Sequence, residues 1–201
     1  MNIKKREYKD YEDYLSHQKS KAPIGSQLHT DLSPGGKCWD SDCEGFKRIF
    51  ETHRETIANL SKGICLGART GQEVVILKEI GLEDCIGIDL NPDPPLVIEG
   101  DVHDLSFDDD SFDFVFSNIF DHVLYHDKFL DEIFRVCKKG GICILHVDNK
   151  YNPETYSASF LEDPAVVTEE LTKRGAEILH EGALDIGMPW PDFYEIVFKI
   201  S

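Results

Sequence analysis

Short apolar runs alternate with amphipathic stretches from residue 63 onward, and this alternation constrains the fold more than any other feature of the sequence. Runs such as FDFVFS and ICILHV are nearly continuous, as in strands that are buried on both faces. Strands that are separated by helical segments form a parallel sheet with helices on both sides. The pattern therefore predicts a Rossmann-like, doubly wound α/β fold.

The runs also place the expected elements along the chain. We expect strands at 64–66, 85–89, 96–98, 112–117 and 142–147. Helices are expected over 72–80 and 128–137, and over 43–60, where apolar residues recur at spacings of three and four. These elements supply the parallel part of the sheet.

The C-terminal region departs from strict alternation. A helix over about 164–174 precedes two strand patterns, AEILHEGAL and FYEIVFKI, which the turn-rich segment DIGMPWPD joins. A strand that is followed directly by a strand predicts an antiparallel pair. The expected sheet therefore has seven strands, is mostly parallel and ends in an antiparallel C-terminal hairpin.

Length and composition favour one domain. A chain of 201 residues with 41% hydrophobic residues is large enough for a substantial core and too short for two ordinary domains. We expect residues 1–62 to form a helical extension that packs on the core or covers the active site. Residues 63–201 are expected to form the ligand-binding domain.

The charge balance excludes some classes of partner. The formal net charge of −17 argues against general nucleic-acid binding, which relies on clustered lysine and arginine. No run approaches the roughly 18 apolar residues of a membrane span, and the N-terminal stretch is polar throughout. We therefore expect a cytoplasmic protein without membrane contact.

The six cysteines divide into two groups. Four of them, Cys65, Cys85, Cys137 and Cys143, lie in apolar runs and are expected in the core. The other two, Cys38 and Cys43, lie in a polar stretch after His29 and suggest a metal pair as an alternative. Because zinc sites use tighter spacing and a second pair of ligands, we expect no metal.

The segment GARTGQE follows the first expected strand and has the composition of a ligand-binding loop. Gly67 and Gly71 allow a sharp turn and close approach of a ligand, and the helix that follows presents free N–H groups to a negative group. Arg69 between them has a guanidinium that pairs well with a carboxylate. The alternative is a plain tight turn, because two glycines alone are weak support.

Further landmarks follow this loop in order. Asp89 ends the second strand, where a carboxylate accepts hydrogen bonds from ribose hydroxyls. Asp101 lies in GDVHDLSF, and RVCKKGG precedes the strand at 142–147. With these four landmarks, the region from about 63 to 147 resembles the class I S-adenosylmethionine-dependent methyltransferases, specifically the methyltransferase type 11 group.

The resemblance implies that residues 63–201 bind S-adenosylmethionine as cofactor. It also implies which residues contact each part of the cofactor. The glycine loop and the end of the fourth strand would hold the methionine part, the acid after strand two the ribose, and the GDVH segment the adenine. The implied cofactor-binding residues are Gly67, Ala68, Arg69, Gly71, Glu73, Asp89, Leu90, Asp101, Val102, His103, Ser117 and Asn118.

Two positions depart from the family pattern. The family often has an acid two residues before the first glycine, where this chain has Cys65. Arg69 replaces the usual middle glycine. Glu73 follows the loop closely and is the candidate to replace the missing acid.

The loop SNIFDHVLYHD, after the fourth strand, is expected beside the transferred methyl group. His122 is the best candidate base, because an unperturbed imidazole titrates near neutrality, and Asp121 adjoins it. Tyr125 and His126 are further candidates for acceptor binding. The alternative is that these residues only cap and cover a short helix.

Other candidates lie farther along the chain. His146 and Asp148 close the fifth strand and are candidates for the acceptor pocket, although His146 fits a core position equally well. Four aromatic residues are candidates for packing over an acceptor, namely Trp39, Tyr151, Tyr156 and Trp190.

The predicted function is methyl transfer by direct displacement to an unidentified O, N or C nucleophile, on a small molecule or a locally accessible group. Alignment of nucleophile, methyl and sulfur supplies much of such catalysis. The alternative is a catalytically inactive, methyltransferase-like protein that binds the cofactor or a partner. A nicotinamide-dependent oxidoreductase is disfavoured by the C-terminal strand pair and by RVCKKGG.

Overall fold

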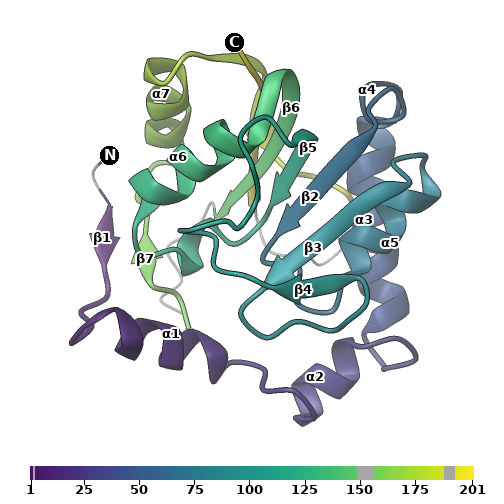
Figure 1. Cartoon of the computed structure of the whole chain (residues 1–201), viewed down its shortest axis with the longest axis vertical. Helices are drawn as coiled ribbons and strands as arrows, with labels where there is room; N and C mark the ends of the chain where they lie inside the picture. Colours follow the sequence, from purple (N-terminus) through teal and green to yellow (C-terminus); the bar gives the residue numbers. More distant parts are fainter. Residues whose placement is uncertain (2, 149–155, 188–192) are drawn as a thin grey trace.

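The centre of the computed structural model, which describes residues 1, 3–148, 156–187 and 193–201, is a seven-stranded sheet in the order β4-β3-β2-β5-β6-β9-β8 (Figure 1). Its strands are β2 (Lys62–Leu66), β3 (Asp84–Asp89), β4 (Val97–Glu99), β5 (Phe112–Ser117), β6 (Cys137–Asp148), β8 (Ala176–Ala183) and β9 (Phe193–Ile200). The five strands from β4 to β6 run parallel to one another, and β9 is antiparallel to both β6 and β8. The predicted fold class, with its antiparallel C-terminal hairpin, is confirmed.

Helices cover both faces of the sheet. They are α1 (Tyr11–Lys19), α2 (Gln27–Leu32), α3 (Trp39–Thr52), α4 (Arg54–Ile57), α5 (Gln72–Glu79), α6 (His126–Val136) and α7 (Ala165–Lys173), with a 3-10 turn η1 (Phe120–His122). Phe50 of α3 and Leu77 of α5 pack in one hydrophobic cluster, and Phe129 of α6 and Leu171 of α7 in another. Each cluster lies between one layer of helices and one face of the sheet.

Side chains alternate between these clusters along the strands. In β2, Ile64 and Leu66 contribute to the cluster under α6 and α7, whereas Cys65 contributes to the cluster under α3 and α5. Successive residues of a strand point to opposite faces, so a strand between two helical layers must be apolar at every position. This is why the central runs are continuous rather than alternating.

The single helix expected over 43–60 is wrong, because the chain forms α3 and α4 with a break at His53. The backbone of His53 has φ −114° and ψ 12°, outside the helical region. Its Nε2 lies 2.9 Å from Oε1 of Glu195, a buried carboxylate of β9. The break directs His53 toward that carboxylate. This partner could not be predicted from the local sequence pattern.

The start of the fifth parallel strand also differs from expectation. β6 begins at Cys137, which pairs with Phe112, rather than at 142, and α6 ends at Val136. A register shift between Phe112 and Phe114 accommodates the glycine pair before Ile142. The segment expected to be a loop therefore extends the sheet.

The order of the strands reverses beside β2, whose neighbours are β3 on one side and β5 on the other. Ligands of open α/β sheets bind beyond the carboxyl ends of the strands at such a reversal. Helix α1 lies across this edge, and β1 (Lys4–Lys5) pairs with β7 (Ser159–Phe160) beside it (Figure 1). No helix within the described ranges is both long and apolar enough to cross a membrane.

Candidate functional site

The glycine loop between β2 and α5 makes the tight turn that its sequence predicts. Gly67 and Gly71 have φ of +85° and +86°, and Arg69 has φ +43°. A Cβ atom on Gly67 would lie 2.6 Å from Cγ2 of Ile119, so a larger residue cannot fit there without a shift. Gly71 is the N-cap of α5. The loop is therefore held in a conformation that glycine adopts readily.

Asp89 joins this loop to the end of β3. Its Oδ2 accepts the backbone N–H of Arg69 at 3.0 Å, and its Oδ1 accepts that of Asn91 at 2.8 Å. Burial raises the pKa of the Asp89 carboxyl, although these two amides oppose the shift. Each carboxylate oxygen has a second acceptor site, so Asp89 can bind hydroxyl groups of a ligand while it fixes the loop.

A first hollow lies between this edge of the sheet and helix α1. Its lining residues come from α1 and the segment after it, the glycine loop, the ends of β3 and β4, and η1 with the residue before it: Tyr14, Gln18, Lys21, Ala22, Gly67, Arg69, Asp89, Leu90, Asn91, Gly100, Asp101, Val102, Ile119 and His122. Six of the predicted cofactor-binding residues lie here, namely Gly67, Arg69, Asp89, Leu90, Asp101 and Val102.

Asp101 is held by a polar network that includes the N-terminal helix. Its Oδ1 accepts from the backbone N–H of His103 at 2.9 Å and lies 2.8 Å from Nδ1 of the same residue. The hydroxyl of Tyr11 donates to Oδ2 at 2.5 Å. Nε2 of His103 accepts the N–H of Tyr125, which leaves the hydrogen on Nδ1. His103 therefore orients Asp101 and does not itself line the hollow.

A second hollow lies on the other side of the glycine loop. It is lined by Lys21, Leu32, Asp42, Phe46, Gly67, Ala68, Arg69, Thr70, Gln72, Glu73, Asn118, Ile119, Asp121, His122, Asp148 and Phe193. Five residues line both hollows, namely Lys21, Gly67, Arg69, Ile119 and His122. The two hollows therefore meet at these five residues.

Glu73 is a buried carboxyl group on the wall of the second hollow. It is 4% exposed, and its carboxylate receives no hydrogen bond from another residue in the part of the chain that the structure describes. Burial raises the pKa of Glu73 to about 8. Burial raises the pKa of the Cys65 thiol most, and Cys85 and Glu73 add smaller contributions. A carboxyl group in the first turn of α5 thus lies close to Cys65.

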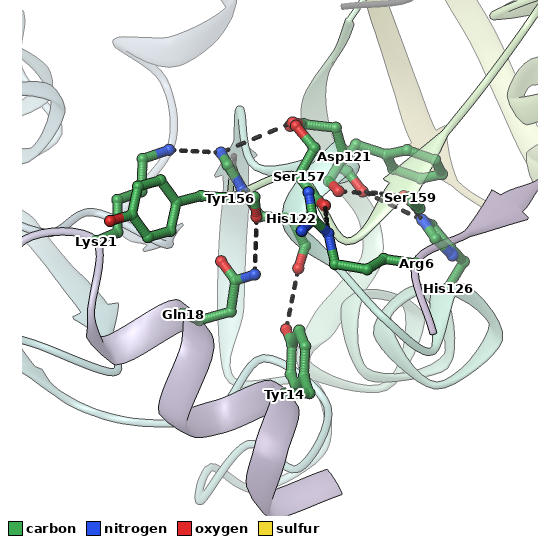
Figure 2. A network of polar contacts seen from close by, with 11 residues as sticks. Arg6, Tyr14, Gln18, Lys21, Asp121, His122, His126, Tyr156, Ser157 and Ser159 are labelled. Carbon is green, nitrogen blue, oxygen red and sulfur yellow. Dashed lines mark hydrogen bonds and ion pairs between the residues drawn. The ribbon is translucent and has the colours of Figure 1, made fainter. Parts of the chain in front are cut away.

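Of the predicted catalytic pair, His122 lies at the junction of the hollows and Asp121 lines the second hollow. Figure 2 shows the contacts of both side chains. Nε2 of His122 is 3.7 Å from Oδ2 of Asp121 and 2.8 Å from Nζ of Lys21, and Nδ1 lies 3.0 Å from the carbonyl oxygen of Tyr156. Ser157 donates to Oδ2 of Asp121 at 2.7 Å. Burial lowers the pKa of His122, so the imidazole is neutral at pH 7.

Helix α1 contacts this pair directly. The Tyr14 hydroxyl donates to the carbonyl of His122 at 3.1 Å, and Nε2 of Gln18 donates to the carbonyl of Tyr156 at 2.8 Å (Figure 2). Asn91 also donates to the carbonyl of Lys19 at 2.6 Å. The N-terminal segment is thus one wall of the site.

Several candidates lie away from both hollows. The hydroxyl of Ser117 donates to the carbonyl of Leu66, and Ser117 lines neither hollow, so its contact with the cofactor stays a prediction. His126 is buried against Phe120 and Ser159, and Tyr125 stacks on Tyr11. Gly71 caps α5 and His103 contacts Asp101, but neither residue lines a hollow. Trp39 and Tyr156 also line neither hollow.

Candidates near the fifth strand divide in the same way. His146 is fully buried, and its Nε2 lies 2.9 Å from Oε2 of Glu195, so it has the core position that was the alternative. Asp148 lines the second hollow. Tyr151 and Trp190 lie outside the described residues. Cys38 and Cys43 are free thiols.

Several residues that line the hollows come from segments distant in the sequence and were not predicted as site residues. Lys21, Asp42, Phe46 and Phe193 belong to the N-terminal segment, to α3 and to β9. Tyr8, Tyr11 and Tyr14 recur at a helical spacing around the start of α1, but no local signal connects this helix to the site.

This sheet order, with a glycine loop and an acid at its reversal, defines the class I methyltransferase fold. Residues 64–145 match the family described as methyltransferase domain, so the type 11-like resemblance expected from the motifs is confirmed. No curated protein sequence matches the chain.

Solved structures share the fold at low sequence identity. A protein of Pyrococcus horikoshii aligns with a TM-score of 0.62 and 17% identity, over 91% of this chain and 96% of its own. A methyltransferase of Archaeoglobus fulgidus that depends on S-adenosylmethionine gives 0.61 and 16%, over 78% and 94%. A methyltransferase of Haloferax volcanii in complex with the Trm112 methyltransferase activator gives 0.59 and 20%, over 80% and 94%.

Proposed function

We propose that this protein transfers a methyl group from S-adenosylmethionine to an acceptor that binds in the second hollow. The observation that carries the proposal is the pair of adjoining hollows at the sheet reversal, one beside Asp89 and one beside Asp121. The methyltransferase-domain match and the S-adenosylmethionine-dependent relatives support S-adenosylmethionine as the cofactor. Bound there, the cofactor supplies an electrophilic methyl group on a sulfonium.

The residues of the first hollow suit the nucleoside part of the cofactor. Asp89 retains acceptor sites for the two ribose hydroxyls, and Leu90 and Val102 offer apolar contacts to the base. The free acceptor site on Oδ2 of Asp101 suits an exocyclic amino group. Tyr11 and His103 hold that carboxylate in place and lower its pKa against the effect of burial.

The glycine loop suits the amino acid part. The guanidinium of Arg69 is the partner for a carboxylate, and Glu73 is the partner for an ammonium group, in place of the acid that Cys65 replaces. Ala68 and Asn118 complete this wall. We assign residues 1–62 as an extension that covers the site through α1, and residues 63–201 as the cofactor-binding domain.

His122 is the proposed base and Asp121 the group that stabilises its protonated form. The neutral imidazole suits proton acceptance, and the carboxylate 3.7 Å away favours the imidazolium. Loss of turnover in His122→Ala or Asp121→Ala, with cofactor affinity retained, is the expected result.

The second candidate function is a methyltransferase-like protein that binds the cofactor or a partner without turnover. Two contacts favour it, because each uses an atom that the enzyme would need. Lys21 donates a hydrogen bond to Nε2 of His122, and the Tyr11 hydroxyl donates one to Oδ2 of Asp101. The Haloferax relative that binds an activator gives a precedent for a partner. Cofactor affinity without methyl transfer across a broad acceptor panel would support this reading.

Calorimetric titration with S-adenosylmethionine, S-adenosylhomocysteine and NAD, side by side, tests the proposal. We expect micromolar binding of the two adenosyl compounds and none of NAD. Absence of binding by both adenosyl compounds would refute the proposed cofactor site.

A further inference from the structure

Lys21 and His122 form one contact at the place where the two hollows meet (Figure 2). In the proposed function, the methyl group passes from a cofactor in the first hollow to an acceptor in the second. Groups that line both hollows therefore lie at the point of transfer. Only two of the five such residues, Lys21 and His122, have side chains in direct hydrogen-bond contact with each other.

The hydrogen bonds of His122 fix which nitrogen is free to react. Nδ1 lies 3.0 Å from the carbonyl oxygen of Tyr156, and a carbonyl oxygen only accepts, so Nδ1 carries the hydrogen. The neutral ring therefore presents a lone pair at Nε2, to which the ammonium of Lys21 donates at 2.8 Å. A strong donor and a basic acceptor thus face each other across the junction.

We propose that the acceptor group is a neutral hydroxyl, best supplied by a phenol, whose oxygen binds between Nζ of Lys21 and Nε2 of His122. This inference rests on the proposed function and names its substrate class. A hydroxyl group both accepts and donates, so it converts the present N–H···N contact into N–H···O–H···N. Two hydrogen bonds of ordinary length require the two nitrogens to separate by roughly 2 Å more, which the flexible lysine side chain allows.

The number of lone pairs favours oxygen over nitrogen. A hydroxyl oxygen has two lone pairs, so one can accept from Lys21 while the other attacks the methyl carbon. A neutral amine has one lone pair, and a hydrogen bond from Lys21 would occupy the pair that must react. A protonated amine has none, so it would have to lose a proton before it could attack the methyl carbon.

The surrounding charges also disfavour an acceptor that is a carboxylate. Four carboxyl groups line the second hollow, from Asp42, Glu73, Asp121 and Asp148. The three aspartates would repel an anion, whereas all four carboxyl groups can accept hydrogen bonds from further hydroxyl groups. Phe46 and Phe193 in the same wall offer apolar contact to an aromatic ring. A phenol, with a pKa near 10, is more acidic than an aliphatic alcohol and therefore gives its proton more readily to an imidazole base.

The reaction that this arrangement supports is balanced. The phenol oxygen forms a bond to the methyl carbon as the carbon–sulfur bond breaks, and the electron pair of that bond stays on sulfur. The hydroxyl proton passes to Nε2 of His122. Asp121 stabilises the imidazolium against Lys21 and Arg69, the two cations that face it, until the proton is lost to water.

The test compares 4-methylphenol, 4-methylaniline, 4-methylbenzylamine and 4-methylbenzoate, which share a ring and differ in the reacting group. Each is titrated into protein saturated with S-adenosylhomocysteine, and the ring nitrogens of His122 are followed by NMR of ¹⁵N-histidine-labelled protein, with His122→Gln for assignment. We expect the phenol to bind most tightly and to shift Nε2 of His122. Tighter binding of either amine or of the benzoate, or no effect of any compound on His122, would overturn the inference. Failure to bind S-adenosylhomocysteine would instead refute the proposed function.

Lys21→Met tests the lysine separately. In protein saturated with S-adenosylhomocysteine, we expect 4-methylphenol to bind about tenfold more weakly, as for a lost hydrogen bond to a charged group. The pKa of His122 should rise, because a neighbouring positive charge is gone. Lys19→Met is the matched control, since Lys19, the last residue of α1, pairs with the exposed Glu99 and lines neither hollow. An unchanged His122 titration in Lys21→Met, or an equal loss of phenol affinity in Lys19→Met, would also overturn the inference.

Discussion

Glu73 carries the clearest consequence at the scale of single residues, because burial raises its pKa to about 8. Without a bound partner, Glu73 is therefore mostly protonated at pH 7. If Glu73 pairs with the ammonium group of the cofactor, binding must ionise it, since opposite charge favours the carboxylate. Calorimetry at pH 7 in buffers of different ionisation enthalpy should show release of most of one proton in the wild type and almost none in Glu73→Gln. Equal proton release in both proteins would contradict this pairing.

Asp89 provides the second test at this scale. Asp89→Ala should weaken binding of S-adenosylmethionine by about 1–3 kcal/mol, through loss of charge-assisted hydrogen bonds to ribose. The carboxylate also holds the N–H groups of Arg69 and Asn91, so Asp89→Asn, which keeps one acceptor oxygen, should lose less. Titration calorimetry of the three proteins measures the order. Unchanged affinity in Asp89→Ala would remove the ribose from this position.

The site residues that follow a strand could be predicted from the sequence. Asp89 and Asp121 come directly after apolar runs, and parallel strands bring their carboxyl ends to one edge. Lys21 and Phe193 could not be found in this way, because one lies in a polar N-terminal segment and the other begins an antiparallel strand. Their places depend on tertiary packing rather than on local pattern.

At the scale of elements, helix α1 forms a wall of the first hollow and is predicted to retain the cofactor. Tyr14→Phe removes the hydrogen bond to the carbonyl of His122 and leaves that acceptor without its partner. We expect cofactor affinity to fall by about 0.5–1.5 kcal/mol, mainly through faster dissociation, measured by stopped-flow. Tyr8→Phe is the matched control, because the Tyr8 hydroxyl bonds to His17 on the same helix. A similar effect of both changes would show that only helix stability matters.

Glu195 links three elements through His53 and His146. Burial alone would raise the pKa of Glu195, but the two imidazoles outweigh it and lower this pKa to about 2. A carboxyl group with a lowered folded-state pKa stabilises the fold above its unfolded value near 4.5, and this contribution is lost as pH falls toward 2. Urea unfolding should therefore show roughly 3 kcal/mol less stability at pH 7 in Glu195→Ala, and a shallower loss of stability between pH 4.5 and 3. Equal acid sensitivity of both proteins would contradict the assignment.

The same group explains why helix boundaries were predictable only in part. Apolar spacing over 43–60 continues through His53 and gives no sign of a break. The break occurs because His53 reaches a carboxylate 142 residues away in sequence. Helix α5, whose start is set by Gly71 and whose face is set by its own apolar residues, began and ended close to the predicted positions.

At the scale of the whole molecule, net charge rather than individual ion pairs should govern the response to salt. The chain has 38 acidic and 21 basic residues, so repulsion among the acids opposes the compact state at pH 7. Exposed pairs such as Arg48–Glu44 contribute only about 0–1 kcal/mol each and are also screened. Raising NaCl from 10 to about 200 mM shortens the Debye length from about 30 to below 10 Å, which weakens the long-range repulsion most. The thermal midpoint should therefore rise by about 2–4 °C at pH 7, as for a gain of about 1 kcal/mol in the free energy of unfolding.

The control is the same titration near pH 4.7, the sequence isoelectric point, where repulsion is absent and salt should have little effect. A fall in the midpoint at pH 7 would mean that the ion pairs on this surface, and not its net charge, dominate its electrostatics.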